Sequence, residues 1–198
     1  MTRRATPWSC RGKAVTYKSY PLFVFGFHGC ERSVAERVLA GEEDLCPSSN
    51  PYDWLGTGVY FWENAPERAL KWARDQKKRE PYAIGAVIQL SSCLNLMDTG
   101  SAEEILRAYD KTVATGHLLP SNTGKRHGLD MFIINLAALM AEDNGRVYDA
   151  VRGAFVEGEE IFPCSSIRSD THIQLCVRNP ACILAYFRPK EMGKGAEG

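Results

Sequence analysis

Three short segments, far apart in the chain, carry residue types that could together hold a nicotinamide nucleotide. His28-Gly29 follows an aromatic-rich apolar run at 21–27, Gly56-Thr-Gly-Val-Tyr60-Phe61 comes next, and Thr171-His-Ile-Gln174 lies near the C-terminal end. Each segment is typical of a strand or strand edge that carries one polar or aromatic side chain. Assembled in one place, they would form a pocket suited to breaking the bond between nicotinamide and ribose.

That reaction requires a rigid hold on the carboxamide, an aromatic clamp on the ring and support for a ribose that becomes cationic. Gly29 lacks a Cβ, so its backbone can approach a planar amide closely. The imidazole of His28 can hydrogen-bond a ribose hydroxyl with either nitrogen. Tyr60 and Trp72 could enclose a pyridinium ring, a contact that contributes roughly 0.5–2 kcal/mol per aromatic residue.

A glutamate on a strand would normally complete such a site by accepting a hydrogen bond from the ribose 2′-hydroxyl. Gln174 occupies the corresponding position here. Its carbonyl oxygen accepts a hydrogen bond but carries no charge, so it would stabilise a cationic transition state less. His172 lies two residues earlier on the same face of the strand. The nearby glutamates at 157, 159 and 160 could supply the missing carboxylate, although we expect them to cap a loop.

The tyrosine segment at 56–61 is similar to the Gly-x-Gly-[Ile/Val]-Tyr-Phe segment of the ADP-ribosyltransferases of the poly(ADP-ribose) polymerase and diphtheria-toxin type, which share a His-Tyr-Glu triad. The resemblance covers about 28–76 and 171–187, less than half of the chain. It implies that NAD⁺ is bound through six residues: His28 at the adenosine ribose, Gly29 at the carboxamide, Tyr60 at the nicotinamide ring, Trp72 (one residue out of register) as the second stacking aromatic, and Gly58 and Arg68 nearby.

Two departures from this family pattern bear on activity. Arg68 stands where the polymerase branch has a small hydroxyl residue on the nicotinamide amide, and Gln174 replaces the catalytic glutamate. Family members without that glutamate are usually mono-transferases or inactive, which argues against chain-building polymerase activity. In the toxin branch the residue two before the glutamate often selects the acceptor, and His172 holds that position here. The nearest resemblance is to small bacterial or phage-associated toxins and defence effectors.

The expected function is therefore mono-ADP-ribosyl transfer from NAD⁺ to a macromolecule, protein or nucleic acid, with release of nicotinamide. His28, Tyr60 and Gln174 are the expected catalytic residues, His172 faces the acceptor, and no metal is implied. Two alternatives stay open. Water could be the acceptor, which would make the protein an NAD glycohydrolase. Because Gln174 is uncharged, the domain could also be a catalytically inactive module that binds NAD or ADP-ribose.

Composition narrows the class of protein further. Lysine plus arginine equals aspartate plus glutamate, 24 each, so the whole molecule lacks the charge of a dedicated DNA-binding module. Seven cysteines form no Cys-x-x-Cys pair, and we expect reduced thiols in a cytoplasmic protein. The N-terminus does not resemble a signal peptide, and the apolar run at 131–141 is too short to cross a membrane.

The pattern of the chain predicts a single α+β domain over residues 1–198, with two packed antiparallel sheets that form a split NAD cleft, helices around them, and a two-helix insertion at about 100–150. The expected strands are 21–27, 58–62, 82–90, 173–177 and 182–187, the last two joined by a turn at 178–181. The expected helices are 33–40, 64–79, 101–115 and 129–140, with Ser33, Asn64 and Ser101 as their capping residues.

One helix face carries Arg68, Lys71, Arg74, Lys77, Lys78 and Arg79. Such a run is most often a solvated surface, which is the interpretation we favour. Because it adjoins the predicted pocket, contact with a phosphate of NAD⁺ or of the acceptor is the alternative. His117 and His127 fall in predicted loops and receive no role.

Overall fold

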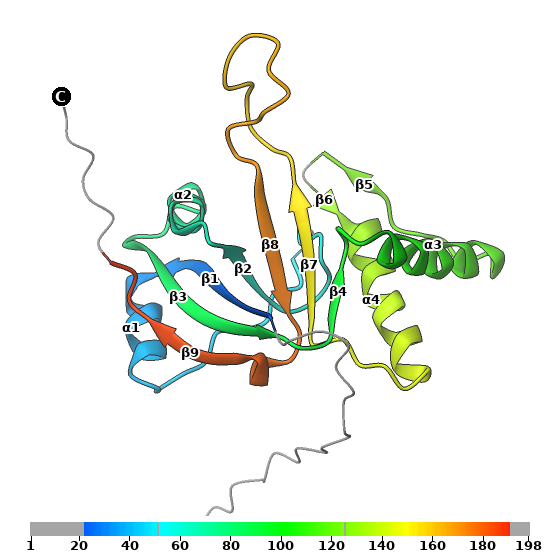
Figure 1. The fold of residues 1–198 in the computed structure, drawn as a ribbon, viewed down its shortest axis with the longest axis horizontal. Coiled ribbons are helices and arrows are strands. Elements are labelled where there is room, and N and C mark those ends of the chain that lie inside the picture. Colours follow the sequence, from blue (N-terminus) through cyan, green and yellow to red (C-terminus); the bar gives the residue numbers. More distant parts are fainter. Residues whose placement is uncertain (1–21, 51, 125, 191–198) are drawn as a thin grey trace, which may run out of the picture.

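The computed structural model describes residues 22–50, 52–124 and 126–190. Its strands are β1 (Leu22–Glu31), β2 (Val59–Glu63), β3 (Pro81–Leu90), β4 (Cys93–Asn95), β5 (Asn122–Thr123), β6 (Arg126–His127), β7 (Ala150–Phe155), β8 (His172–Val177) and β9 (Ile183–Phe187). Seven of them form one mixed sheet in the order β4-β7-β8-β2-β1-β3-β9, and β5 pairs with β6 in a separate hairpin (Figure 1). The α+β class predicted from the sequence is therefore confirmed. The prediction of two packed antiparallel sheets is wrong for the described residues, because these seven strands form one continuous sheet in which β4 and β7 run parallel.

The sheet is joined only narrowly at its centre. β1 pairs with β3 at ten register positions but with β2 at two, Gly26↔Glu63 and Phe27↔Trp62. Beyond Phe27 the residues of β1 have no register partner in β2, so the two strands diverge there. Hydrogen bonding is antiparallel throughout the large sheet except between β4 and β7, which run parallel.

The described part of the chain has four α-helices packed around the sheet: α1 (Arg32–Leu39), α2 (Pro66–Asp75), α3 (Thr99–Ala114) and α4 (Gly128–Asp143). All four were predicted, but their capping residues were not. The N-caps of the first three are Glu31, Ala65 and Asp98 rather than Ser33, Asn64 and Ser101, and only the Asp98 side chain accepts a backbone hydrogen bond. Each of the three helices begins at a residue where the chain leaves a strand or turn, so the local hydroxyl or amide pattern does not decide the start.

The two faces of the sheet bury different clusters. One face packs Phe61, Ile84 and Leu175 against α1 and its flanking loop. Because side chains alternate along a strand, Tyr60 and Trp62 of β2 share the opposite face. There Trp62 packs with α2, whereas Tyr60 packs with residues of α4 and β7.

The connection between β7 and β8 is long. Residues 156–171, which we call the β7–β8 loop, extend as a hairpin-like projection beyond the sheet (Figure 1). The next connection contains the 3₁₀ helix η1 (Pro180–Cys182) and crosses to the far edge of the sheet, where β9 pairs with β3. The predicted turn at 178–181 is present, with the backbone N–H of Cys182 donating to the carbonyl oxygen of Asn179, although β8 and β9 do not pair with each other. Among the described helices, none is long and apolar enough to cross a membrane.

Candidate functional site

His28 lies where β1 and β2 diverge and bridges them with its side chain. Its Nδ1 is 2.8 Å from the carbonyl oxygen of Tyr60. Since a carbonyl only accepts hydrogen bonds, Nδ1 carries the hydrogen and donates it. Burial lowers the pKa of the His28 imidazole, so the ring is neutral near pH 7 and Nε2 is a hydrogen-bond acceptor. His28 is thus fixed in one tautomer at the fork between the strands.

The Cα of Gly29 faces helix α2 at very short range. A Cβ on Gly29 would lie 2.3 Å from the carbonyl oxygen of Ala69 and 3.1 Å from Cε3 of Trp72. A side chain there would collide with helix backbone, so this glycine permits the close packing of α2 on β1. The space on this side of Gly29, which we predicted would receive a carboxamide, is filled by the helix.

The hydroxyl group of Tyr60 makes two hydrogen bonds, one as a donor and one as an acceptor. The Oη donates to the carbonyl oxygen of Gly56 at 2.7 Å and accepts from the backbone N–H of Leu55 at 3.0 Å. Burial raises the pKa of the Tyr60 phenol, which therefore stays protonated. Gly58 approaches the neighbouring strand so closely that a Cβ would lie 2.5 Å from the carbonyl oxygen of Val177. In this structure the Gly-x-Gly-Val-Tyr segment builds a tight turn that anchors the tyrosine.

The structure does not bring Tyr60 and Trp72 together as a sandwich. Trp72 packs beside Trp62, with ring centroids 5.7 Å apart, in the cluster under α2. Tyr60 packs in the cluster under α4. Trp62, which was not singled out from the sequence, therefore takes the position beside α2 that we had expected a ligand ring to occupy. Strict alternation along 59–63 was the signal that could have indicated it.

Gln174 lies at the centre of the sheet, half-buried, with Trp62 on one neighbouring strand and Gly153 on the other in register. His172, two residues earlier on the same face, is buried, with 2% of its side chain exposed. Its ring stacks on Phe155 at 5.7 Å between centroids. The side chain of His172 therefore offers no surface to a macromolecule in this conformation.

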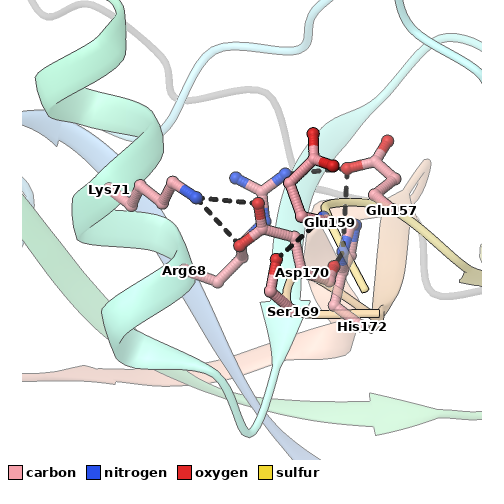
Figure 2. A network of polar contacts seen from close by, with 7 residues as sticks. All are labelled: Arg68, Lys71, Glu157, Glu159, Ser169, Asp170 and His172. Atoms are coloured by element: carbon pink, nitrogen blue, oxygen red, sulfur yellow. Dashed lines mark hydrogen bonds and ion pairs between the residues drawn. The ribbon is translucent and has the colours of Figure 1, made fainter. Parts of the chain in front are cut away.

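Ion pairs connect helix α2 to the β7–β8 loop next to His172 (Figure 2). Arg68 Nη2 lies 2.8 Å from Glu157 Oε2, and Lys71 Nζ donates to both carboxylate oxygens of Asp170 at 2.9 and 2.7 Å. The Lys71 ammonium lowers the pKa of the Asp170 carboxyl group. At least two cations of the basic helix face are thus engaged with acidic side chains rather than free in solvent.

His172 joins the same network from below. Its Nδ1 donates to the backbone carbonyl of Asp170 at 2.6 Å and lies 4.0 Å from Glu157 Oε2. Burial lowers the pKa of the His172 imidazole. Of the three neighbouring glutamates, Glu157 is thus the one tied to Arg68 and His172. The carboxylate of Glu160 instead accepts from the backbone N–H of Cys164 within the loop.

An apolar cavity on this side of the sheet lies apart from these residues. Its volume is about 580 Å³, and it lies between α3, α4 and the end of β7. Its walls are mostly apolar and include Trp54, Leu55, Leu106, Tyr109, Ile134 and Phe155. The predicted site residues do not line it. In the part of the chain that the structure describes, no cluster of three or more histidine, cysteine, aspartate or glutamate side chains could hold a metal ion.

Comparisons with known proteins leave the chain without an assigned relative. No protein-family model, no curated protein and no solved structure matches it. Function must therefore be argued from the site itself.

Proposed function

We propose that the protein is a mono-ADP-ribosyltransferase that moves ADP-ribose from NAD⁺ to a macromolecular acceptor, a protein or a nucleic acid. In this reaction the bond between nicotinamide N1 and ribose C1′ breaks, and the electron pair leaves with neutral nicotinamide. A nucleophile of the acceptor then bonds to C1′ and loses its proton. The cytoplasm and a toxin or defence role are the setting that the resemblance favours.

The observation that carries this proposal is the fork between β1 and β2. The strands part after the Phe27↔Trp62 pair, and His28 stands at the fork with its Nε2 available as an acceptor. A central sheet that splits into two parts is the architecture expected for an NAD cleft. The proposal requires NAD⁺ to pass between the diverging strands, with the adenosine ribose at His28 and the nicotinamide on the face of Trp62 and Gln174.

The remaining roles follow from the same placement. Gln174 accepts a hydrogen bond from the nicotinamide-side ribose, and the tightly held Tyr60 supports the strand face next to it. Glu157 is the carboxylate nearest to His172 and supplies negative charge that Gln174 lacks. Charge placed beside a cationic sugar stabilises the transition state more than a neutral amide does.

A catalytically inactive module that binds NAD or ADP-ribose is the second candidate. Two observations favour it: Gln174 carries no charge, and the helix fills the space beside Gly29. A glycohydrolase, with water as acceptor, differs from the transferase only in what attacks C1′.

Nicotinamide release from NAD⁺ by the purified protein, with and without cell lysate, separates these functions. Release that requires lysate indicates a transferase, and release without lysate indicates a glycohydrolase. We expect His28→Ala to reduce release by about 100-fold, with its melting temperature recorded to confirm folding. The control is His117→Ala, on the loop after α3. Binding of NAD⁺ without any release would leave the inactive module as the function.

A further inference from the structure

Three buried polar atoms without a hydrogen-bond partner belong to side chains that neighbour one another beneath helix α2. In the described ranges these atoms are Trp62 Nε1, Arg68 Nε and His172 Nε2, each with less than 1 Å² exposed. They come from three different elements, β2, α2 and β8. Buried polar groups in proteins are almost always paired, so three unpaired ones on neighbouring side chains require an explanation.

The three side chains are neighbours on one face of the sheet. The guanidinium carbon of Arg68 lies 5.9 Å from the Trp62 ring centre, and the Trp62 and His172 ring centroids are 6.5 Å apart. Gln174, opposite Trp62 in register and two residues from His172, borders the same place. Counted over the whole residue, backbone included, Trp62 is 4% exposed and His172 is 7% exposed, so both are held by packing on all sides.

The hydrogen-bonding capacity of the three atoms is fixed by their surroundings. The indole Nε1 and the guanidinium Nε are donors in any state. The His172 Nδ1 hydrogen is already given to the Asp170 carbonyl, and burial keeps the ring neutral, so its Nε2 is an acceptor. The place therefore presents two donors and one acceptor. A primary carboxamide is complementary to this set, because its oxygen accepts two hydrogen bonds and its NH₂ group donates.

We infer that Trp62, Arg68 and His172 form a binding site for a primary carboxamide, and that its ligand is the nicotinamide end of NAD⁺. This inference rests on the proposed function and assigns the carboxamide to side chains instead of the backbone of Gly29. Carboxylic acid analogues fit the site poorly once the loop has closed, since a carboxylate has no hydrogen to donate to His172 Nε2 and the charge of Arg68 is already compensated by Glu157. The site thus distinguishes amide from acid.

Access to the site is controlled by the ion pairs of Figure 2. Arg68 and Glu157 are partly exposed, with 18% and 37% of their side chains accessible, and Lys71 is 51% exposed. Partly exposed ion pairs contribute little to stability, so outward movement of the β7–β8 loop is inexpensive. We expect nicotinamide to enter when Glu157 and Asp170 move away from helix α2.

Binding of nicotinamide and of nicotinate to the full-length protein, measured by calorimetry or ligand-observed NMR, tests the site. Nicotinamide should bind at least about tenfold more tightly than nicotinate, the effect of one or two hydrogen bonds. Equal binding, or tighter binding of nicotinate, overturns the inference. Because this comparison uses the unaltered protein, it decides the matter even where a variant fails to fold.

Two variants each remove one of the unpaired polar atoms, and the controls lose the same side-chain volume elsewhere. Trp62→Phe removes the indole donor, and His172→Asn retains a donor to Asp170 but removes the Nε2 acceptor. Each should weaken nicotinamide binding about tenfold. The matched controls are Trp54→Phe and His127→Asn. Trp54 lines the apolar cavity under α4 and His127 packs on Trp54, so these variants should bind nicotinamide as tightly as the unaltered protein does. Unchanged binding in both test variants overturns the site.

The experiments distinguish failure of the carboxamide site from failure of the proposed transferase function. Nicotinamide binding that depends on Trp62 and His172, without release from NAD⁺ under any condition, supports the site and removes the transferase. Release from NAD⁺ with no dependence on these residues supports the transferase and removes the site.

Discussion

The two halves of one sheet face are built in opposite ways. Under α2 the packing is close, the helix backbone touches β1 at Gly29, and polar atoms and ion pairs are concentrated. Under α4 the packing is apolar and leaves a cavity of about 580 Å³. Neighbouring residues of one strand divide between them, since Trp62 belongs to the first half and Tyr60 to the second.

This difference shows that the free volume and the polar groups of this sheet face lie in different places. Apolar cavities of several hundred Å³ often bind small molecules, but here the cavity offers one carboxylate, Asp130, and few other polar groups. The half under α2 offers donors, an acceptor and charges with little free space. We therefore propose that the α2 half holds the reacting site and that the α4 half is mainly structural. The predictions below test that division in order of expected size.

Gly29→Ala tests how tightly the α2 half is packed. The added methyl group would lie 2.3 Å from the Ala69 carbonyl oxygen, so helix α2 must move. We expect a loss of about 3 kcal/mol in the free energy of unfolding, measured by denaturant titration. Gly100→Ala in α3 is the matched control, because its nearest atom is 3.8 Å away and alanine favours helix. A loss in Gly100→Ala equal to that in Gly29→Ala would contradict the contrast between the halves.

Glu157→Gln tests whether the α2 half supplies the charge that Gln174 lacks. We expect nicotinamide release to fall about 30-fold, equivalent to about 2 kcal/mol in the activation free energy. Adding Gln174→Glu to this variant should restore much of the rate, because a carboxylate returns to the same sheet face. Glu160→Gln is the control, since its carboxylate lies within the loop. Full activity in Glu157→Gln would remove Glu157 from the site.

Acid should destabilise the protein through His172 in the α2 half and through His28 on the other face of the sheet. Burial lowers the pKa of both His28 and His172, so below about pH 6.5 the unfolded chain binds more protons than the folded one. The free energy of unfolding therefore falls as the pH drops from 7 to 5, by at most about 1.4 kcal/mol per pH unit for each histidine. In urea titrations His172→Asn should make this dependence shallower. His127→Asn should change it less, because Asp130 opposes the lowering of that pKa.

The local structure of the chain was predictable where one short pattern is sufficient. The aromatic run at 21–27 predicted the first half of β1, and the alanines of α2 predicted the buried helix face. The end of α1 at Gly41 was also expected, and its φ of +73° suits glycine. By contrast, β4, β5, β6 and β7 were missed. The longest of them, β7, has six residues and contains arginine and glycine, which do not favour a strand. It is stabilised by its neighbours in the sheet and not by its own composition.

The site was less predictable than the fold, because strand register decides it. Because Phe27 pairs with Trp62 in register, its side chain lies on the same face of the sheet as Trp62. The side chain of His28 then lies on the other face, beside Phe61. A sequence lists His28, Tyr60 and Gln174 but cannot show on which face each lies when the partner residues are unknown. The unpaired atoms of Trp62 and His172 likewise depend on long-range packing.

Ala102→Leu tests the α4 half and has the smallest expected effect. Ala102 lines the rim of the cavity on α3, and a leucine there can extend over Leu106 and Ile134. Burying part of that side chain should raise the free energy of unfolding by about 1 kcal/mol. Because the cavity is separated from His172 by Phe155, nicotinamide release should stay unchanged. Loss of release without loss of stability would show that the cavity belongs to the reacting site, and the division of the sheet face into a structural and a reactive half would be wrong.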